Sequence, residues 1–82
     1  IYFFDSFCLN TTNLVDNFFK DKYDLNKQYL KIQVSKSKKI IEKLDVTTYP
    51  VIKIYKNNTE INELFCTNNI FIDNLDKFYN NI

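Results

Sequence analysis

The pattern of apolar and polar residues predicts two strands in the first half of the chain. A continuous apolar run at residues 1–4, IYFF, is typical of a short buried strand. Between residues 29 and 34, YLKIQV, every second residue is aliphatic. This period of two predicts a strand with Leu30, Ile32 and Val34 on one face.

The same pattern predicts a hairpin further along the chain. Residues 51–56, VIKIYK, and residues 60–65, EINELF, are both strand-like, and the polar stretch NNT separates them. Asparagine tolerates a positive φ better than other non-glycine residues, so Asn57 and Asn58 can form the tight turn. We therefore expect the two strands to pair in antiparallel fashion.

Three further segments have apolar residues at helical spacing and predict helices with one buried face. The first covers about residues 9–23, the second follows a capping residue at Ser35 or Ser37, and the third is C-terminal. The expected inner-face residues are Leu14, Val15, Phe18, Phe19 and Tyr23 in the first helix, Ile40, Ile41 and Leu44 in the second, and Ile70, Phe71, Leu75, Phe78 and Tyr79 in the third.

The predicted order is strand, helix, strand, helix, strand, strand, helix, which is a βαβαββα arrangement. A parallel unit followed by an antiparallel hairpin and a terminal helix indicates an α/β fold, with a mixed sheet covered by helices on both faces. Residues 1–82 are expected to form a single domain. Because Ile1 begins directly within a predicted strand, we expect this domain to be part of a longer chain.

Composition excludes several classes of site. The sequence contains no histidine and no glycine, which rules out a histidine-activated nucleophile, a histidine metal site and the glycine-rich nucleotide-binding loops. Two cysteines are too few for a four-thiolate zinc site, so no metal and no other cofactor is expected. The net charge of +1 gives no electrostatic footprint for nucleic acid, and no apolar run is long enough for membrane insertion.

Two short stretches carry the candidate chemistry. FDSFCLNT, residues 4–11, places Cys8 between the first predicted strand and the first predicted helix. VTTYPVIKIYKNNTE, residues 46–60, places the sole proline, Pro50, at the start of the predicted hairpin. Proline at this position allows either a cis peptide bond or an ordinary trans start to the strand.

Together these stretches resemble the thioredoxin fold, in particular the domains of protein disulfide isomerases. The resemblance covers essentially all of the chain but lacks the first strand and helix of a full thioredoxin domain. It implies that Cys8 matches the attacking cysteine of that family and that Thr11 stands where the resolving cysteine should be. It also implies that Phe7 replaces the aromatic residue before the attacking cysteine and that Pro50 matches the family's cis-proline. Tyr49 would then offer backbone hydrogen bonds to an extended client peptide.

A thiolate at a helix N-terminus is stabilised by free backbone N–H groups and by the positive end of the helix dipole. Cys8 is therefore expected to be a nucleophile, with the Thr11 hydroxyl as a hydrogen-bond donor to it. Without a resolving cysteine in the motif, the resemblance implies a monothiol function, in which Cys8 forms mixed disulfides with unfolded or cysteine-containing client polypeptides. Such a thiol–disulfide oxidoreductase retains clients or isomerises their disulfides. Tyr2, which falls where many members of the family bury a carboxylate, fits this interpretation.

Alternatives are open at both cysteines. Cys8 can instead be an inert thiol in a redox-inactive domain that binds a fixed protein partner. Cys66 is either a buried small hydrophobe or an unconventional resolving thiol that pairs with Cys8. The resemblance implies a client groove across Phe7, Tyr49, Pro50 and Cys66. It also implies an address in the endoplasmic reticulum lumen or the secretory pathway, with the cytoplasm as the alternative, because two cysteines are compatible with either.

Overall fold

The computed structural model describes residues 1–22, 27–66 and 71–80 and shows a small α/β domain. Its strands are β1 (Tyr2–Phe4), β2 (Lys31–Gln33), β3 (Val51–Lys56) and β4 (Thr59–Phe65), and its α-helices are α1 (Leu9–Asp21), α2 (Lys38–Lys43) and α3 (Phe71–Asn80). The short 3₁₀ turns η1 (Ser6–Cys8) and η2 (Val34–Lys36) precede α1 and α2. The predicted order of strands and helices is confirmed.

The strands form one mixed sheet in the order β2-β1-β3-β4. β1 pairs in parallel with β2, whereas the pairs β1–β3 and β3–β4 are antiparallel. Tyr2 lies opposite Lys31 on one side and Ile52 on the other, and Val51 lies between Phe3 and Phe65. β1 is therefore an inner strand with neighbours on both sides, which explains why its sequence is continuously apolar.

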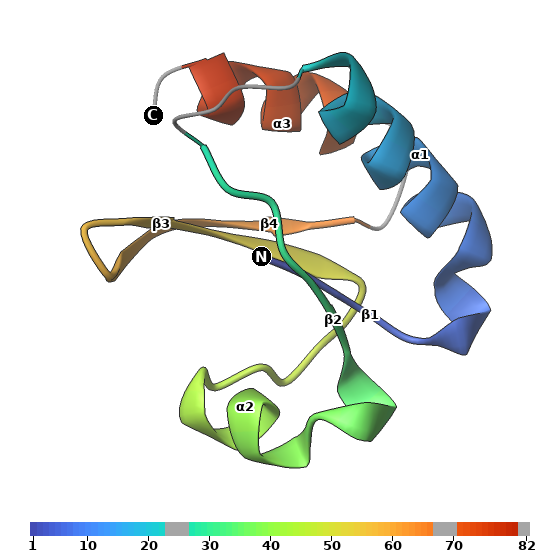
Figure 1. Ribbon diagram of the computed structural model, residues 1–82, viewed down its shortest axis with the longest axis vertical. Helices are drawn as coiled ribbons and strands as arrows, with labels where there is room; N and C mark the ends of the chain where they lie inside the picture. Colours follow the sequence, from blue (N-terminus) through green and yellow to red (C-terminus); the bar gives the residue numbers. More distant parts are fainter. Residues whose placement is uncertain (23–26, 67–70, 81–82) are drawn as a thin grey trace.

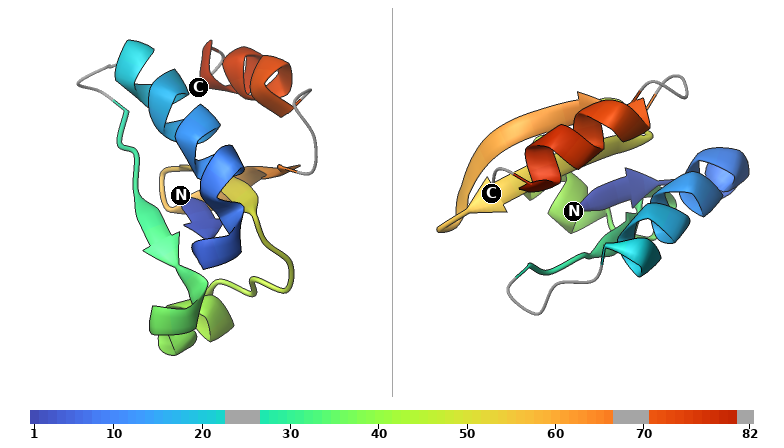
Figure 2. Two further views of the ribbon diagram at one scale, coloured as in Figure 1. Left: turned by 90° about the vertical axis from the view of Figure 1, so that its right-hand side faces the viewer. Right: turned by 90° about the horizontal axis from the view of Figure 1, so that it is seen from above.

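Helices cover both faces of the sheet, as Figure 1 shows: α1 and α3 lie over one face and α2 lies over the other. Figure 2 shows α1 and α3 side by side, and the rings of Phe18 and Tyr79 join them with centroids 5.7 Å apart. The core cluster beneath these two helices consists of Tyr2, Val15, Phe18, Ile52, Ile54, Leu64, Cys66, Phe71, Leu75 and Tyr79. The smaller cluster on the opposite face consists of Phe3, Val46 and Val51.

The two clusters divide the residues of β1 between them, because successive side chains of a strand point to opposite faces. Tyr2 packs beneath α1 and α3, whereas Phe3 packs toward α2, and both side chains are fully buried. The prediction of a buried first strand is confirmed.

The hairpin turn also agrees with the prediction. Asn57 and Asn58 both have positive φ, 54° and 65°, and they join β3 to β4. These values lie in the left-handed region, which asparagine tolerates better than most residues. The pairing of β3 with β4 shifts register between Ile54 and Tyr55.

Two apolar residues expected on the inner faces of helices, Leu14 and Ile40, are in fact exposed. Leu30, predicted to share a strand face with Ile32 and Val34, precedes β2 and is also exposed. The buried stripe of α1 runs through Val15 and Phe18, and a neighbouring residue lies about 100° around the helix from such a stripe. In α2 only Ile41, together with Leu44 just after it, packs against the smaller cluster. Helical spacing predicted the correct buried face of each helix but assigned too many residues to it.

Three predicted boundaries and caps also differ from the structure. The expected strand at 29–34 is reduced to Lys31–Gln33, because the chain turns into η2 at Val34. Ser37 stands at the N-cap position of α2 but makes no capping hydrogen bond through its side chain. The Ser35 hydroxyl donates to Asp5 instead, 3.2 Å away. The predicted helix positions 23 and 70 lie outside the described residues.

Candidate functional site

Cys8 lies at the end of the sheet toward which β1 runs. After β1, the turn η1 leads directly into α1, and Cys8 is both the last residue of η1 and the N-cap of α1. Its backbone N–H donates to the Asp5 carbonyl oxygen at 2.9 Å. In return, the Asp5 N–H donates to Cys8 Sγ at 3.5 Å. The sulfur therefore turns back toward β1, and the Cys8 side chain is only 4% exposed.

Asp5 anchors this turn to β2 and η2. Its Oδ1 accepts hydrogen bonds from the Ser6 N–H at 2.8 Å, from Gln33 Nε2 at 3.4 Å and from Ser35 Oγ at 3.2 Å. The bond from Ser6 is the main reason why the pKa of the Asp5 carboxyl is lowered, and those from Gln33 and Ser35 act in the same direction. The Asp5 side chain thus joins the turn that carries Cys8 to both β2 and η2.

Phe7 brings the Cys8 turn next to the loop before β3. Its ring lies against the ring of Tyr49, with centroids 5.7 Å apart and planes tilted by 42°. Phe7 is 70% exposed and Tyr49 is 38% exposed, so the pair presents an aromatic surface to solvent. The peptide bond between Tyr49 and Pro50 is cis, which decides between the two alternatives left open by the sequence.

Cys66 follows β4 and is joined to Pro50 by a backbone hydrogen bond. Its N–H donates to the Pro50 carbonyl oxygen at 3.1 Å, and its thiol donates to the Leu64 carbonyl oxygen at 3.7 Å. The side chain is 4% exposed and belongs to the core cluster beneath α1 and α3. Burial raises the pKa of the Cys66 thiol to about 12, and the charge of Cys8 acts in the same direction. Both cysteines are free thiols.

Tyr2 lies in the core near these two thiols. Its hydroxyl shares a hydrogen bond of 2.9 Å with Thr12 Oγ1, in the first turns of α1. Burial raises the pKa of Tyr2 to about 12; Cys8 and Cys66 add to the rise, whereas the bond to Thr12 opposes it. A phenol therefore occupies the position where the resemblance led us to consider a missing carboxylate.

Thr11 does not contact the cysteine in the way that the sequence suggested. Within residues 1–22, 27–66 and 71–80, no hydrogen bond joins the Thr11 hydroxyl to Cys8, and the donor to the sulfur is the Asp5 N–H. Thr11 is partly exposed in the first turn of α1. Its predicted role toward a Cys8 thiolate stays a prediction.

Sequence reasoning missed two exposed apolar residues of this region. Leu9, directly after Cys8, is 66% exposed, and Phe65, the last residue of β4, is 49% exposed. Phe65 lies opposite Val51, next to Pro50. The sequence could have predicted that Phe65 is exposed. Successive side chains of a strand point to opposite faces of the sheet, so one core cannot bury every residue of β4. We call these four exposed residues, Phe7, Leu9, Tyr49 and Phe65, the apolar rim; Phe7 contacts Tyr49, and Phe65, opposite Val51, is on the face of the sheet toward α2.

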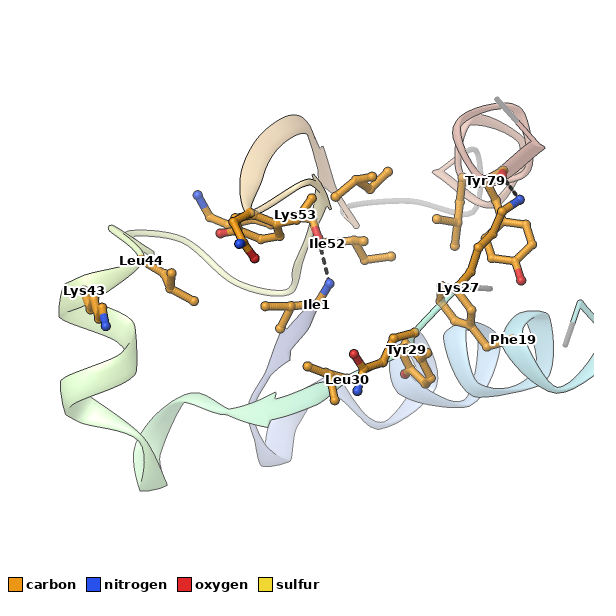
Figure 3. Close-up of a pocket in the computed structure, with 15 residues that line it drawn as sticks. Ile1, Phe19, Lys27, Tyr29, Leu30, Lys43, Leu44, Ile52, Lys53 and Tyr79 are labelled. Carbon is orange, nitrogen blue, oxygen red and sulfur yellow. Dashed lines mark hydrogen bonds between the residues drawn. The ribbon is translucent and has the colours of Figure 1, made fainter. Parts of the chain in front are cut away.

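A separate cavity of about 640 Å³ lies at the opposite end of the sheet. Figure 3 shows it between side chains of α1, α2, α3 and β3, with Ile1 at its edge. Lys27 spans one side, where its Nζ donates to the Tyr79 carbonyl oxygen at 2.6 Å and lies 4.2 Å from the Tyr79 ring centroid. Among the described residues, none of those predicted for the client groove lines this cavity.

The comparisons with known proteins found no match, and the described residues contain neither a candidate metal site nor a candidate membrane span. No family model, curated protein or solved structure matches this chain. The described residues contain no group of three or more histidine, cysteine, aspartate or glutamate side chains that could hold a metal ion. In the same part of the chain, no helix is long and apolar enough to cross a membrane.

Proposed function

We propose that this chain is a thioredoxin-like domain of the protein disulfide isomerase type that binds extended, cysteine-containing polypeptides at the apolar rim. Cys8 is the nucleophile that forms mixed disulfides with these clients. The observation that carries the proposal is the contact between Phe7 and Tyr49, which brings the residue before Cys8 against the residue before a cis-proline.

The arrangement of the elements supports this fold. The βαβαββα order, the mixed sheet and the helices on both faces agree with what the resemblance implies. The attacking cysteine is expected at the N-terminus of the first helix, and Cys8 is the N-cap of α1. The proline is expected at the start of the hairpin, and Pro50 directly precedes β3.

The chemistry needs no oxidant or reductant beyond the client itself. The Cys8 thiolate attacks one sulfur of a client disulfide, a bond forms between Cys8 Sγ and that sulfur, and the other client sulfur leaves as a thiolate. A second client thiolate then attacks the mixed disulfide and expels Cys8. The client has exchanged one disulfide for another, and the domain returns to its starting state with no net transfer of electrons.

A binding role is supported by the apolar rim. Phe7 and Leu9 flank Cys8 in the sequence and are the most exposed of the large apolar residues in the described part of the chain. Exposed aromatic and aliphatic side chains that lie close together mark sites of interaction with other proteins. An extended peptide that lies across Phe7 and Tyr49 would pass the turn that carries Cys8 and the loop that carries Pro50.

One observation favours a second candidate, a redox-inactive domain that binds a fixed protein partner through the same rim. Cys8 is only 4% exposed, with its sulfur turned toward the Asp5 N–H. A nucleophilic cysteine is usually partly accessible to its substrate. In this second candidate the rim binds the partner and Cys8 is only a small buried side chain.

Trapping of a model client distinguishes the two candidates. The Cys66→Ser variant is incubated, under native conditions, with an extended peptide whose single cysteine carries an activated disulfide, and the product is analysed by intact mass under non-reducing conditions. We expect a covalent adduct at Cys8, with none in Cys8→Ser. A Cys66→Ser protein that binds the peptide without forming an adduct would leave only the redox-inactive candidate.

A further inference from the structure

The two cysteines lie at the same end of the sheet. β1 and β4 run in the same direction, because both are antiparallel to β3, and the chain enters the Cys8 turn from β1 and reaches Cys66 from β4. Val51 lies opposite Phe3 in β1 and opposite Phe65 in β4. Cys66, the next residue, is therefore level with the end of β1.

They also lie on the same face. Cys66 belongs to the core cluster beneath α1 and α3, together with Tyr2 and Val15, and Cys8 is the N-cap of α1. Tyr2 connects the two positions, since its ring shares that cluster with Cys66 and its hydroxyl bonds to Thr12, about one helical turn after Cys8. The charge of Cys8 acts on the pKa of Cys66, as expected of neighbouring thiols.

We propose that Cys66 is the resolving thiol for Cys8 and that the two residues form an internal disulfide when the domain reduces a client. This inference rests on the proposed function of Cys8 and changes its outcome. A domain with Cys8 alone can only exchange one disulfide for another. The pair can donate two electrons to a client and so reduce a client disulfide to two thiols. The missing second cysteine of the motif is then supplied by the strand that ends beside Pro50.

The reaction proceeds in two balanced steps. First, the Cys8 thiolate attacks a client disulfide and forms a Cys8–client disulfide, with one client thiolate as leaving group. Second, the Cys66 thiolate attacks Cys8 Sγ, the Cys8–Cys66 bond forms and the remaining client sulfur leaves as a thiolate. The client disulfide is reduced to two thiols, the two protein thiols are oxidised to one disulfide, and their protons pass to the client thiolates.

Burial makes the second step strongly dependent on pH. The thiol of Cys66 has a pKa raised to about 12, mainly by burial, and the titratable groups near it are Cys8, Tyr2 and Tyr29. Cys8 carries no charge once it is in a mixed disulfide, so burial, opposed by the backbone hydrogen bond of Ile52, then sets the pKa of Cys66. Because the thiolate is the attacking species, the rate of this step is expected to rise about tenfold per pH unit between pH 7 and 9.

The test uses glutathione disulfide as a small client and intact mass under non-reducing, acid-quenched conditions. In the wild-type chain we expect a short-lived glutathione adduct that converts to a species two hydrogen atoms lighter than the reduced protein, faster at pH 9 than at pH 7. In Cys66→Ser, or in Cys66→Ala if the serine variant folds poorly, we expect the adduct to persist. Peptide mapping of the lighter species is expected to join Cys8 to Cys66.

The outcomes separate this inference from the function on which it rests. If the wild-type chain keeps its glutathione adduct as long as Cys66→Ser does, Cys66 does not resolve it, and Cys8 acts as a monothiol. If neither protein forms an adduct, the proposed nucleophile is wrong and the inference fails with it. A lighter species in which the sulfurs join two different molecules, detected by its doubled mass, would also overturn the internal disulfide.

Discussion

The Phe7 ring packs against the Tyr49 ring with 5.7 Å between their centroids, although 41 residues of chain separate them. This contact joins the turn that carries Cys8 to the loop that enters β3 through Pro50. Phe7 is largely open to solvent and Tyr49 is partly so, so the contact builds a surface and does not close a core.

The first prediction concerns that surface. Phe7→Ser and Tyr49→Ser are each expected to weaken binding of an extended apolar peptide about tenfold, because exposed aromatic residues dominate the energetics of peptide contacts. The peptide carries serine in place of cysteine, so that only non-covalent binding is measured, by fluorescence anisotropy. Ile61→Ser is the matched control, since Ile61 is also exposed but lies near the hairpin turn. Equal losses in all three variants would mean that the peptide does not bind at the apolar rim.

A second prediction concerns a buried lysine on the face of the sheet toward α2. Lys53 is only 4% exposed, and its Nζ lies 2.8 Å from Glu60 Oε1 and 3.0 Å from Glu63 Oε2. Burial alone would lower the pKa of Lys53, but the two carboxylates outweigh it and the pKa is raised. The ammonium is therefore held in place by both glutamates of β4.

Glu60→Gln and Glu63→Gln are each expected to cost about 1 kcal/mol in the free energy of unfolding, whereas the double variant costs about 3 kcal/mol or more, because it leaves a buried charge without a partner. Denaturant unfolding measures all three. Adding Lys53→Met to the double variant is the control, and it is expected to restore most of the stability. Strictly additive losses in the double variant would show that the two glutamates act independently and that neither compensates for the loss of the other at Lys53.

A third prediction concerns the hairpin turn. Asn58 has a φ of 65°, where glycine has no steric penalty and alanine has one of about 1 kcal/mol. Asn58→Gly is expected to leave the midpoint of thermal unfolding unchanged or slightly higher, and Asn58→Ala to lower it. An alanine variant as stable as the glycine variant would contradict a left-handed conformation at this position.

A fourth prediction concerns stability at high pH. The pKa of Cys66 is raised from 9.0 to about 12, and that of Tyr2 is raised from 10.0 to about 12. Between about pH 9 and pH 12 the unfolded chain loses these protons while the folded chain keeps them, so the free energy of unfolding must fall as pH rises. Below pH 9 neither group contributes to the pH dependence.

Urea unfolding between pH 8 and 11 measures that slope. Cys66→Ala removes one of the two groups and is expected to make the decline shallower above pH 9, whatever its effect on stability at neutral pH. A decline as steep in Cys66→Ala as in the wild-type chain would mean that the folded state does not hold the Cys66 proton.

Much of the architecture could be read from the sequence because its local signals agree with one another. The apolar run of residues 1–4, the asparagine turn and the helical spacing of the apolar residues each predicted the element that formed. The width of each buried face could not be read in the same way. Ile40 fits the helical pattern as well as Ile41 does, and only the short length and placement of α2 decide that Ile41 faces the smaller cluster.

The candidate site was predictable in its parts but not in its geometry. The sequence indicated Cys8 at a helix start and Pro50 at a strand start, and the structure has both there. It gave no sign of η1, which turns the Cys8 sulfur toward the Asp5 N–H and buries it. The predicted hairpin already placed Cys66 after its second strand and near Pro50, but it could not show the hydrogen bond from the Cys66 N–H to the Pro50 carbonyl oxygen, which depends on the exact register.

The central claim, that folding makes Cys8 a nucleophile, is tested most directly by comparing two rates in the Cys66→Ser variant. The rate at which Cys8 attacks a peptide disulfide is measured at pH 7 in the folded protein and in the same protein unfolded in urea. The account predicts that the folded protein reacts faster, because the apolar rim holds the peptide beside Cys8 at the start of α1. A folded protein that reacts more slowly than the unfolded chain would contradict it and identify Cys8 as a buried, inert thiol.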